Sequence, residues 1–165
     1  MYSMTFREAV PEDAFVIAPR LRQRDRDELD AHTPEPHDLV LWRSISMSLA
    51  AWTCLINGRP EAVFGVVPID LLLGHGSPWF LATSETDRVR REFLVHGMYY
   101  LERMKELMPD LENEVDARNT QSIRWLRRLG FRFDEAVPNE YSGMPFHRFY
   151  MTRGDLCAKQ SLALH

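Results

Sequence analysis

Cysteine, long apolar runs and a leading signal pattern are scarce or missing in this chain of 165 residues. Its two cysteines are Cys54, in an apolar run, and Cys157, in a polar tail, so we interpret both as free thiols in a reducing compartment. No apolar run approaches the roughly 20 residues of a membrane-spanning helix. The first residues also lack the charged-then-apolar pattern of a secretion signal. These absences predict a protein that is made in the cytoplasm and does not span a membrane.

Lysine is nearly absent as well, with two residues against 18 arginines. The 24 acidic residues outnumber the 20 basic ones, which gives a formal net charge of -4 and a pI near 5.9. Nucleic-acid binding depends on a concentrated basic surface, so these totals argue against it. With 45% hydrophobic and 27% charged residues, the composition is typical of one globular domain. We place this domain at residues 1–153 and expect a flexible tail over 154–165.

Hydrophobic periodicity predicts the elements of the N-terminal half. They are, in order, a strand over 4–10, a helical region over about 11–31, a helix over 39–49, and strands over 51–56 and 61–67. Within the helical region Pro19 marks a kink or a restart. Arg20, Arg22, Arg24 and Arg26 alternate along it, and on a helix this spacing sweeps around the surface. We therefore interpret them as a solvated, salt-bridged face and not as an anion site.

The C-terminal half alternates strands and helices in the same way. The expected elements are a loop over 68–77, a strand over 78–83, a helix over about 87–108, a strand over 111–117, a short helix within 119–131, a strand over 131–137, a loop over 138–145 and a strand over 146–152. Gly130 stands where a left-handed helix cap belongs. This order predicts an α/β fold in which helices cover both faces of a mixed sheet.

Residues 5–14 and 114–119, with Ser122-Ile123 and Leu129-Gly130-Phe131, resemble the GNAT superfamily of N-acetyltransferases, and the likeness spans the chain to about Arg153. The first stretch is similar to the family's first strand and helix start, and the second is similar to its second acyl-CoA motif. The resemblance implies a mostly antiparallel central sheet of about six to seven strands. It also implies acetyl-CoA as the cofactor of an active enzyme.

The family's pyrophosphate cradle is usually a glycine-rich loop between the fourth strand and the long helix. No glycine stands between Gly76 and Gly97 here, and Glu85 and Asp87 add like charge where the pyrophosphate would sit. The same residues make good helix caps, which explains them without a ligand. Side chains alone remain as cofactor-binding candidates: Ser84, Arg88, Arg90, Arg91 and Asn119.

The family's catalytic groups are also altered. Many GNAT enzymes carry a tyrosine five residues before the Phe of Gly-Phe, and Leu126 stands there in this chain. Glu112 and Glu114, with Asp116 on the same strand, are the candidate general bases, although such a row of acids is also typical of a solvated strand face. The histidines are scattered without ligand spacing, so we predict no metal site.

Residues 78–84, the long helix with its basic start, and residues 119–126 resemble the small GNAT-like proteins of short-tailed bacteriophages. That likeness implies a structural protein of the virion, made in the host cytoplasm and bound in several copies near the portal or ejection apparatus, with little acetyltransferase activity. The candidate contacts with other virion proteins would then be Trp42, Trp52, Trp79, Tyr141 and the 138–145 loop. The alternatives are an active acetyl-CoA-dependent N-acetyltransferase acting on a small amine or host protein, and an inhibitor of a host factor.

Overall fold

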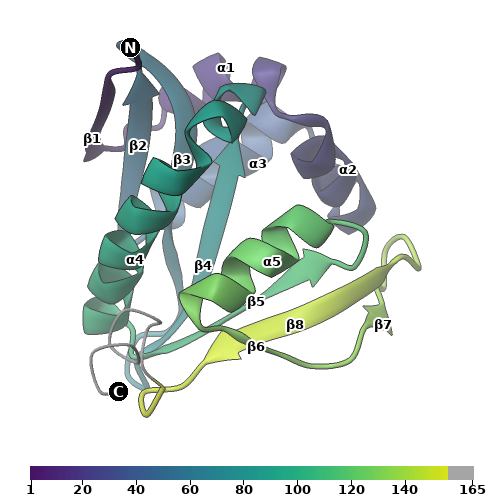
Figure 1. Cartoon of the computed structure of the whole chain (residues 1–165). Helices are drawn as coiled ribbons and strands as arrows, with labels where there is room; N and C mark the ends of the chain where they lie inside the picture. Colours follow the sequence, from purple (N-terminus) through teal and green to yellow (C-terminus); the bar gives the residue numbers. More distant parts are fainter. Residues whose placement is uncertain (156–165) are drawn as a thin grey trace.

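A single sheet of eight strands runs through the computed structural model, which describes residues 1–155 (Figure 1). The strand order is β1-β2-β3-β4-β5-β8-β6, β7 also pairs with β8, and only β4 and β5 are parallel. The strands are β1 (Met4–Glu8), β2 (Ala50–Ile56), β3 (Arg59–Asp70), β4 (His75–Ala82), β5 (Asp110–Asp116), β6 (Arg132–Phe133), β7 (Val137–Pro138) and β8 (Pro145–Met151). The expected mixed, mostly antiparallel sheet is therefore confirmed.

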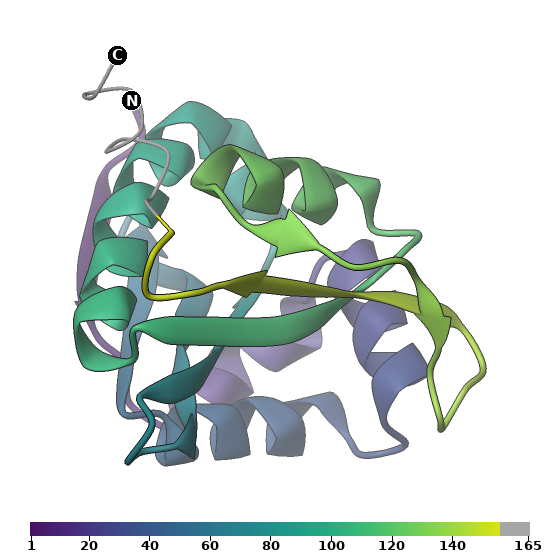
Figure 2. The same cartoon turned by 90° about the horizontal axis from the view of Figure 1, so that it is seen from below.

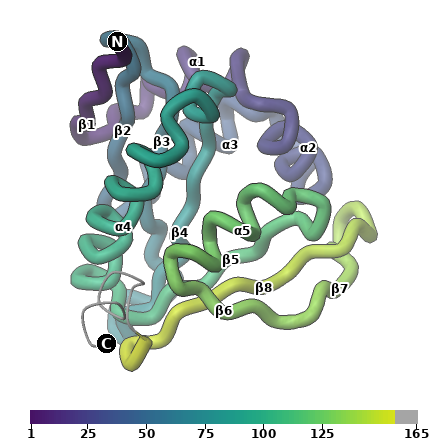
Figure 3. The backbone as a smooth tube through the Cα atoms, viewed as in Figure 1, coloured from purple at the N-terminus to yellow at the C-terminus, as the bar shows by residue number. Residues whose placement is uncertain are grey.

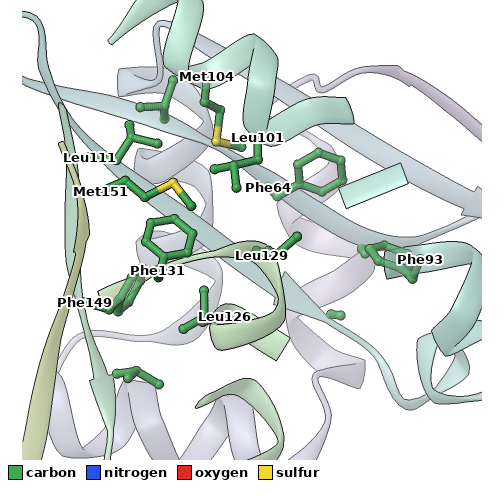
Figure 4. Close-up of a cluster of buried hydrophobic side chains, with 14 of the residues drawn as sticks. Phe64, Phe93, Leu101, Met104, Leu111, Leu126, Leu129, Phe131, Phe149 and Met151 are labelled. Carbon is green, nitrogen blue, oxygen red and sulfur yellow. The ribbon is translucent and has the colours of Figure 1, made fainter. Parts of the chain in front are cut away.

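Helices cover both faces of this sheet (Figures 1 and 2). They are α1 (Asp13–Ile17), α2 (Gln23–His32), α3 (His37–Met47), α4 (Arg90–Leu107) and α5 (Thr120–Leu129), with the 3-10 turns η1 (Ala18–Arg20) and η2 (Ser84–Val89). On one face α4 and α5 bury a core with β3, β5 and β8, which Figure 4 shows around Phe64, Leu111 and Phe149. On the other face a smaller core joins Ile17, Leu41 and further apolar residues.

The expected helical region over 11–31 begins at Asp13 and is broken where Pro19 predicted a restart. Pro19 lies in η1, and the chain then leaves the helix at Leu21, whose φ of -53° and ψ of 138° are not helical. Leu21 forms an isolated bridge with Thr83 before α2 begins at Gln23. Because of this break, the segment between η1 and α2 runs beside the end of β4.

Two boundaries differ from the sequence-based prediction. The loop expected over 68–77 is mostly strand, because β3 continues to Asp70 and β4 begins at His75. Only a short turn joins them, and it ends at Gly74 with a φ of +69°, which favours glycine. The long helix begins at Arg90 instead of residue 87, because residues 84–89 form the 3-10 turn η2.

The expected strand over 131–137 is also wrong in its middle. Within this stretch only the short strands β6 and β7 pair with β8, and the acidic residues between them, Asp134 and Glu135, are exposed. The turn after β7 is confirmed, since Asn139 Oδ1 accepts hydrogen bonds from the N–H groups of Tyr141 and Ser142. Almost all of the expected tail, with Cys157, lies outside the described residues, whereas Cys54 is a buried free thiol.

Of the four aromatic residues predicted to contact partner proteins, two are exposed and two are partly buried. Trp42 and Tyr141 are exposed, whereas Trp52 and Trp79 are partly buried against the two cores. Trp79 is further fixed because its Nε1–H donates to Ser48 Oγ over 2.8 Å. Over residues 1–155, no helix has the length and apolar character needed to cross a membrane.

Candidate active site between the diverging strands

The parallel pair β4 and β5 separates after two residues of ladder, at His75 with Asp110 and at Gly76 with Leu111 (Figure 3). The sequence supplies a local cause. Pro78 is the next residue of β4 whose backbone faces β5, and proline has no N–H to donate to a neighbouring strand. Beyond this point the two strands run apart as the arms of a V.

A side-chain hydrogen bond takes the place of the next backbone hydrogen bond between β4 and β5. Asn113 on β5 donates from Nδ2 to the carbonyl oxygen of Pro78 over 2.8 Å. Its Oδ1 accepts a hydrogen bond from the N–H of Glu114 over 2.7 Å. Asn113 therefore bridges the two arms near the base of the V, at a separation set by a side chain and not by a backbone ladder.

Helix α2 is bound to both arms near their outer ends. Asp25 Oδ2 accepts from the N–H of Ala82 on β4 over 2.9 Å, and the N–H of Arg22 donates to the carbonyl of Ala82 over 3.0 Å. One turn further along α2, Glu28 Oε1 accepts from the N–H of Asp116 on β5 over 2.7 Å. The side chains of one helix thus satisfy facing backbone groups of both diverging strands.

Phe80 keeps its backbone groups turned into the V. The N–H of Thr83 donates to Glu61 of β3 over 2.8 Å, so alternate residues of β4 direct their N–H and C=O groups away from β3. Beyond Pro78 these residues are Phe80 and Ala82, and α2 binds the backbone of Ala82. The backbone groups of Phe80 pair with no strand in the part of the chain that the structure describes. They leave one donor and one acceptor facing the space between the arms.

A cavity of about 300 Å³ occupies that space and reaches both faces of the sheet. On the α4 and α5 side its walls are mainly aromatic, and on the α2 and α3 side they include apolar and acidic residues. The aromatic wall consists of Phe64, Phe80, Phe93, Trp125 and Phe131, and the opposite wall includes Leu29, Val40, Trp79 and Phe146. Trp79 and Phe80 therefore line the cavity without filling it.

Three carboxylates line the same cavity: Asp25, Glu28 and Glu114. Burial raises the pKa of Glu28 from 4.5 to about 7, and the neighbouring carboxylates of Asp25 and Asp116 add to this rise. The hydrogen bond from the N–H of Asp116 opposes it. A carboxylate with a pKa near neutrality, placed on a cavity wall, is suited to accept a proton at physiological pH.

A second hollow, of about 250 Å³, lies between the start of α4 and α5 and is lined by arginines. It shares the walls Phe80, Phe93, Ser122 and Trp125 with the cavity, so the two adjoin. Its cationic side chains are Arg22, Arg24, Arg90, Arg91, Arg124 and Arg128.

These arginines fall into two groups by their ion pairs. Arg24 pairs with Asp87 over 2.7 Å, and Arg22 pairs with Asp25 over 2.9 Å while its guanidinium carbon lies 5.2 Å from the ring centre of Phe80. The other four, at positions 90, 91, 124 and 128, form no ion pair with a carboxylate of residues 1–155. Asp87 also lines the hollow, and Arg90 is close enough to lower the pKa of that carboxyl. Guanidinium groups still outnumber carboxylates around the hollow, which makes it a candidate anion site.

The structure separates the predicted cofactor-binding residues. Arg90 and Arg91 line the arginine hollow, whereas Arg88 is exposed and donates to the hydroxyl of Tyr2 over 2.9 Å. Ser84 and Asn119 line a third, more open hollow of about 620 Å³ beside α2. Asn119 caps α5 by accepting from the N–H of Ser122. Its buried Nδ2 forms no hydrogen bond of normal geometry within residues 1–155, but it lies close enough to Glu28 to oppose the rise in the pKa of that carboxyl.

The two predicted catalytic residues do not lie in the same site. Glu114 lines the cavity, but Glu112 does not, since its carboxylate contacts His75 and Arg148. Leu126, in the position of the family's tyrosine, is buried in the core. In the described part of the chain no group of three acidic, histidine or cysteine side chains is placed to hold a metal ion.

Sequence patterns missed several residues of this site. Glu28 carries no local signal, since nothing in the chain shows that α2 reaches β5. Arg22 and Arg24 were predicted to lie on a solvated, salt-bridged face. The ion pairs are confirmed, but the solvated face is wrong for Arg22, whose side chain is only 10% exposed and lies over Phe80. Arg124 and Arg128 recur one turn apart on α5, which is the signal that would have found them.

No protein-family model matches the sequence, and no curated protein matches it. Solved structures do match. The acetyltransferase of the GNAT family from Streptococcus pneumoniae has 16% identity and a TM-score of 0.59, covering 90% of this chain and 99% of that one. The ribosomal-protein-S18-alanine N-acetyltransferase from Escherichia coli has 18% identity and a TM-score of 0.60, covering 96% and 94%. A variant of spermidine N-acetyltransferase SpeG from Vibrio cholerae has 11% identity and a TM-score of 0.66, covering 91% and 94%.

These likenesses show that the chain has the GNAT acetyltransferase fold, as the sequence resemblance predicted. Their names describe acetyltransferases and mention no phage particle. The expected place in a virion near a portal, with its partner proteins, stays a prediction that none of these matches tests.

The raised pKa of Glu28 predicts how its replacement changes stability. The folded protein binds this proton more tightly than the unfolded chain, so the contribution of Glu28 to stability is lost as pH rises from about 4.5 to about 7. Glu28→Gln keeps an acceptor for the N–H of Asp116 but carries no charge. Urea unfolding should find the variant more stable than wild type by up to about 3 kcal/mol at about pH 8, and by much less at about pH 4.5. An equal stability difference at both pH values contradicts the assignment.

Proposed function

We propose that this protein is an acetyl-CoA-dependent N-acetyltransferase, in which a donor and an acceptor amine meet in the cavity between β4 and β5. The observation that carries the proposal is the continuity of this cavity, which joins the arginine hollow on one side of the sheet to Glu28 on the other. Such a passage lets a thioester and an amine approach from opposite faces, and this holds the reacting groups in one geometry.

The residues of the arginine hollow fit the phosphates of CoA. A glycine loop would bind them by backbone N–H groups, and η2 offers no such loop. Arg90, Arg91, Arg124 and Arg128 supply guanidinium forks instead, which bind phosphate oxygens in pairs. Acetyl-CoA supplies the activated acyl group as a thioester, and side chains take the place of the backbone cradle in holding it.

Phe80 is placed to orient the acyl group. Its N–H and C=O face the cavity and pair with no strand of residues 1–155, so they are available to the amides of the pantetheine arm and to the thioester carbonyl. A backbone donor fixed in a strand needs no reorganisation when negative charge develops on a carbonyl oxygen. Asn113 holds the arms at a fixed separation and thereby keeps this edge accessible.

Glu28 is the general base in this proposal. The nitrogen lone pair of the acceptor attacks the carbonyl carbon of the thioester, the carbon–sulfur bond breaks, and the sulfur leaves as a thiolate. The proton of the nitrogen passes to the Glu28 carboxylate. A pKa of about 7 makes this carboxylate a stronger base than an exposed glutamate while leaving much of it ionised at neutral pH.

The missing tyrosine does not prevent this reaction. Leu126 donates no proton, so the thiolate leaves unprotonated. An ordinary thiol has a pKa of about 8.5, and its thiolate is a stable leaving group near neutral pH. The absence of the tyrosine therefore lowers the expected rate without excluding acetyl transfer.

The role of Glu28 is tested by the pH dependence of acetyl transfer to an amine. Because the base must be ionised, the wild-type kcat should rise with pH and level off above about 7. Glu28→Gln should lower kcat by about a hundredfold or more and remove this inflection. Glu112→Gln is the control, since Glu112 does not line the cavity. A Glu28→Gln variant with the wild-type rate and profile would show that another group accepts the proton.

The arginine hollow is tested by the affinity for acetyl-CoA. Replacing both Arg124 and Arg128 by Gln should weaken binding at least about tenfold, because each removes a charge-assisted contact. Arg127→Gln is the matched control on the same helix, since Arg127 lies over the ring of Phe133 and outside the hollow. Calorimetry measures all three proteins. If wild type does not bind millimolar acetyl-CoA, the proposed function is wrong. If Arg127→Gln weakens acetyl-CoA binding as much as the double variant does, the phosphates are not bound in the arginine hollow.

A further inference from the structure

Two carboxylates on the α2 side of the cavity form no ion pair within residues 1–155, whereas the acids next to them on β5 do. Glu28 and Glu114 form no ion pair with any basic residue of the described chain. Nearby acids are compensated, since Glu112 contacts Arg148 and Asp116 pairs with Arg118 over 2.7 Å. Across residues 1–155 neither lysine nor arginine lines this cavity. Arg118 is close enough for its charge to act on Glu28, and Arg148 lies opposite Glu114 on β8, but neither forms an ion pair with these two acids or lines the cavity. Negative charge therefore predominates on the α2 side of the passage.

The two carboxylates come from different elements but lie along one strand edge. Glu114 and Asp116 alternate with the core residue Val115, so they share the face of β5 that is turned toward α2. Glu28 is fixed at Asp116 by the 2.7 Å hydrogen bond from the N–H of Asp116. Two residues along a strand span roughly 7 Å. The carboxylates are thus spaced for two separate positive groups on one small molecule.

The walls between them are apolar or aromatic. Leu29 and Val40 contribute aliphatic surface, and Trp79 and Phe146 contribute rings, within a cavity of about 300 Å³ in total. Aliphatic surface suits a short methylene chain, and ring faces favour ammonium groups. The apolar and aromatic walls therefore favour a short aliphatic chain that carries ammonium groups, and this observation is separate from the charge of the carboxylates.

From this arrangement we infer that the acceptor is a small diamine, with the reacting amine at Glu28 and a second ammonium group at Glu114. The inference rests on the proposed function for the reaction itself, but the binding of the diamine does not require turnover. Glu114 acts as a specificity residue because it attracts a distal positive charge and repels a distal carboxylate. An acceptor without a distal charge gains nothing from it.

Three acceptors of equal chain length test the distal group: 1,4-diaminobutane, butylamine and 4-aminobutanoate. Wild type should show the highest kcat/KM for the diamine and the lowest for the aminobutanoate. Glu114→Gln should lower kcat/KM for the diamine about five- to tenfold and leave butylamine nearly unchanged. Glu114→Lys should shift the preference toward 4-aminobutanoate. Glu112→Gln, on the same face of the same strand, should keep the wild-type order.

Calorimetry of 1,4-diaminobutane with wild type and Glu114→Gln separates this inference from the proposed function. Binding that weakens in the variant supports the inference even where no acetyl transfer is detected. Equal kcat/KM for diamine and butylamine in wild type, or a diamine preference that survives Glu114→Gln, overturns it. Acetyl-CoA should bind wild type and Glu114→Gln with the same affinity. If neither protein binds acetyl-CoA but wild type still binds the diamine, the proposed function is wrong and the inference about Glu114 stands.

Discussion

After Gly76 and Leu111, β4 and β5 no longer pair, and each strand must satisfy its facing backbone groups in another way. Near the base of the V, Asn113 binds the carbonyl of Pro78. Further out, Asp25 and Glu28 of α2 bind the N–H groups of Ala82 and Asp116. These contacts hold open a passage through an otherwise continuous sheet. The position of α2, the burial of Glu28 and the accessible edge at Phe80 all follow from this separation.

Charge is distributed unevenly along the passage. Arginines of α4 and α5 that form no ion pair within residues 1–155 surround one end, and two glutamates of α2 and β5 that also form none there lie at the other. The net charge of -4 does not reveal this division, because it sums all 20 basic and 24 acidic residues regardless of where they lie. A polyanionic donor and a cationic acceptor would each be attracted to a different end. The electrostatics of the site therefore agree with the two-substrate reaction that the cavity permits.

The sequence predicted the order of helices and strands because these depend on local periodicity and on caps such as Asn119 and Gly130. It also showed that no glycine loop follows β4. Contacts across many residues were not predictable: Asp25 meets Ala82 at a separation of 57 residues, and Glu28 meets Asp116 at 88. The raised pKa of Glu28 depends on the second of these contacts and on burial by packing. Only the folded chain brings these groups together.

Amide and arginine side-chain chemical shifts, followed while acetyl-CoA is added, test the central claim of a donor site in the passage most directly. The account predicts saturable changes at the N–H of Phe80 and at the guanidinium groups of Arg124 and Arg128, with little change at Arg127. These signals come from a strand edge and a helix that meet at the shared walls of the cavity and the arginine hollow. The absence of saturable changes at millimolar acetyl-CoA, or changes confined to residues outside both hollows, would contradict it.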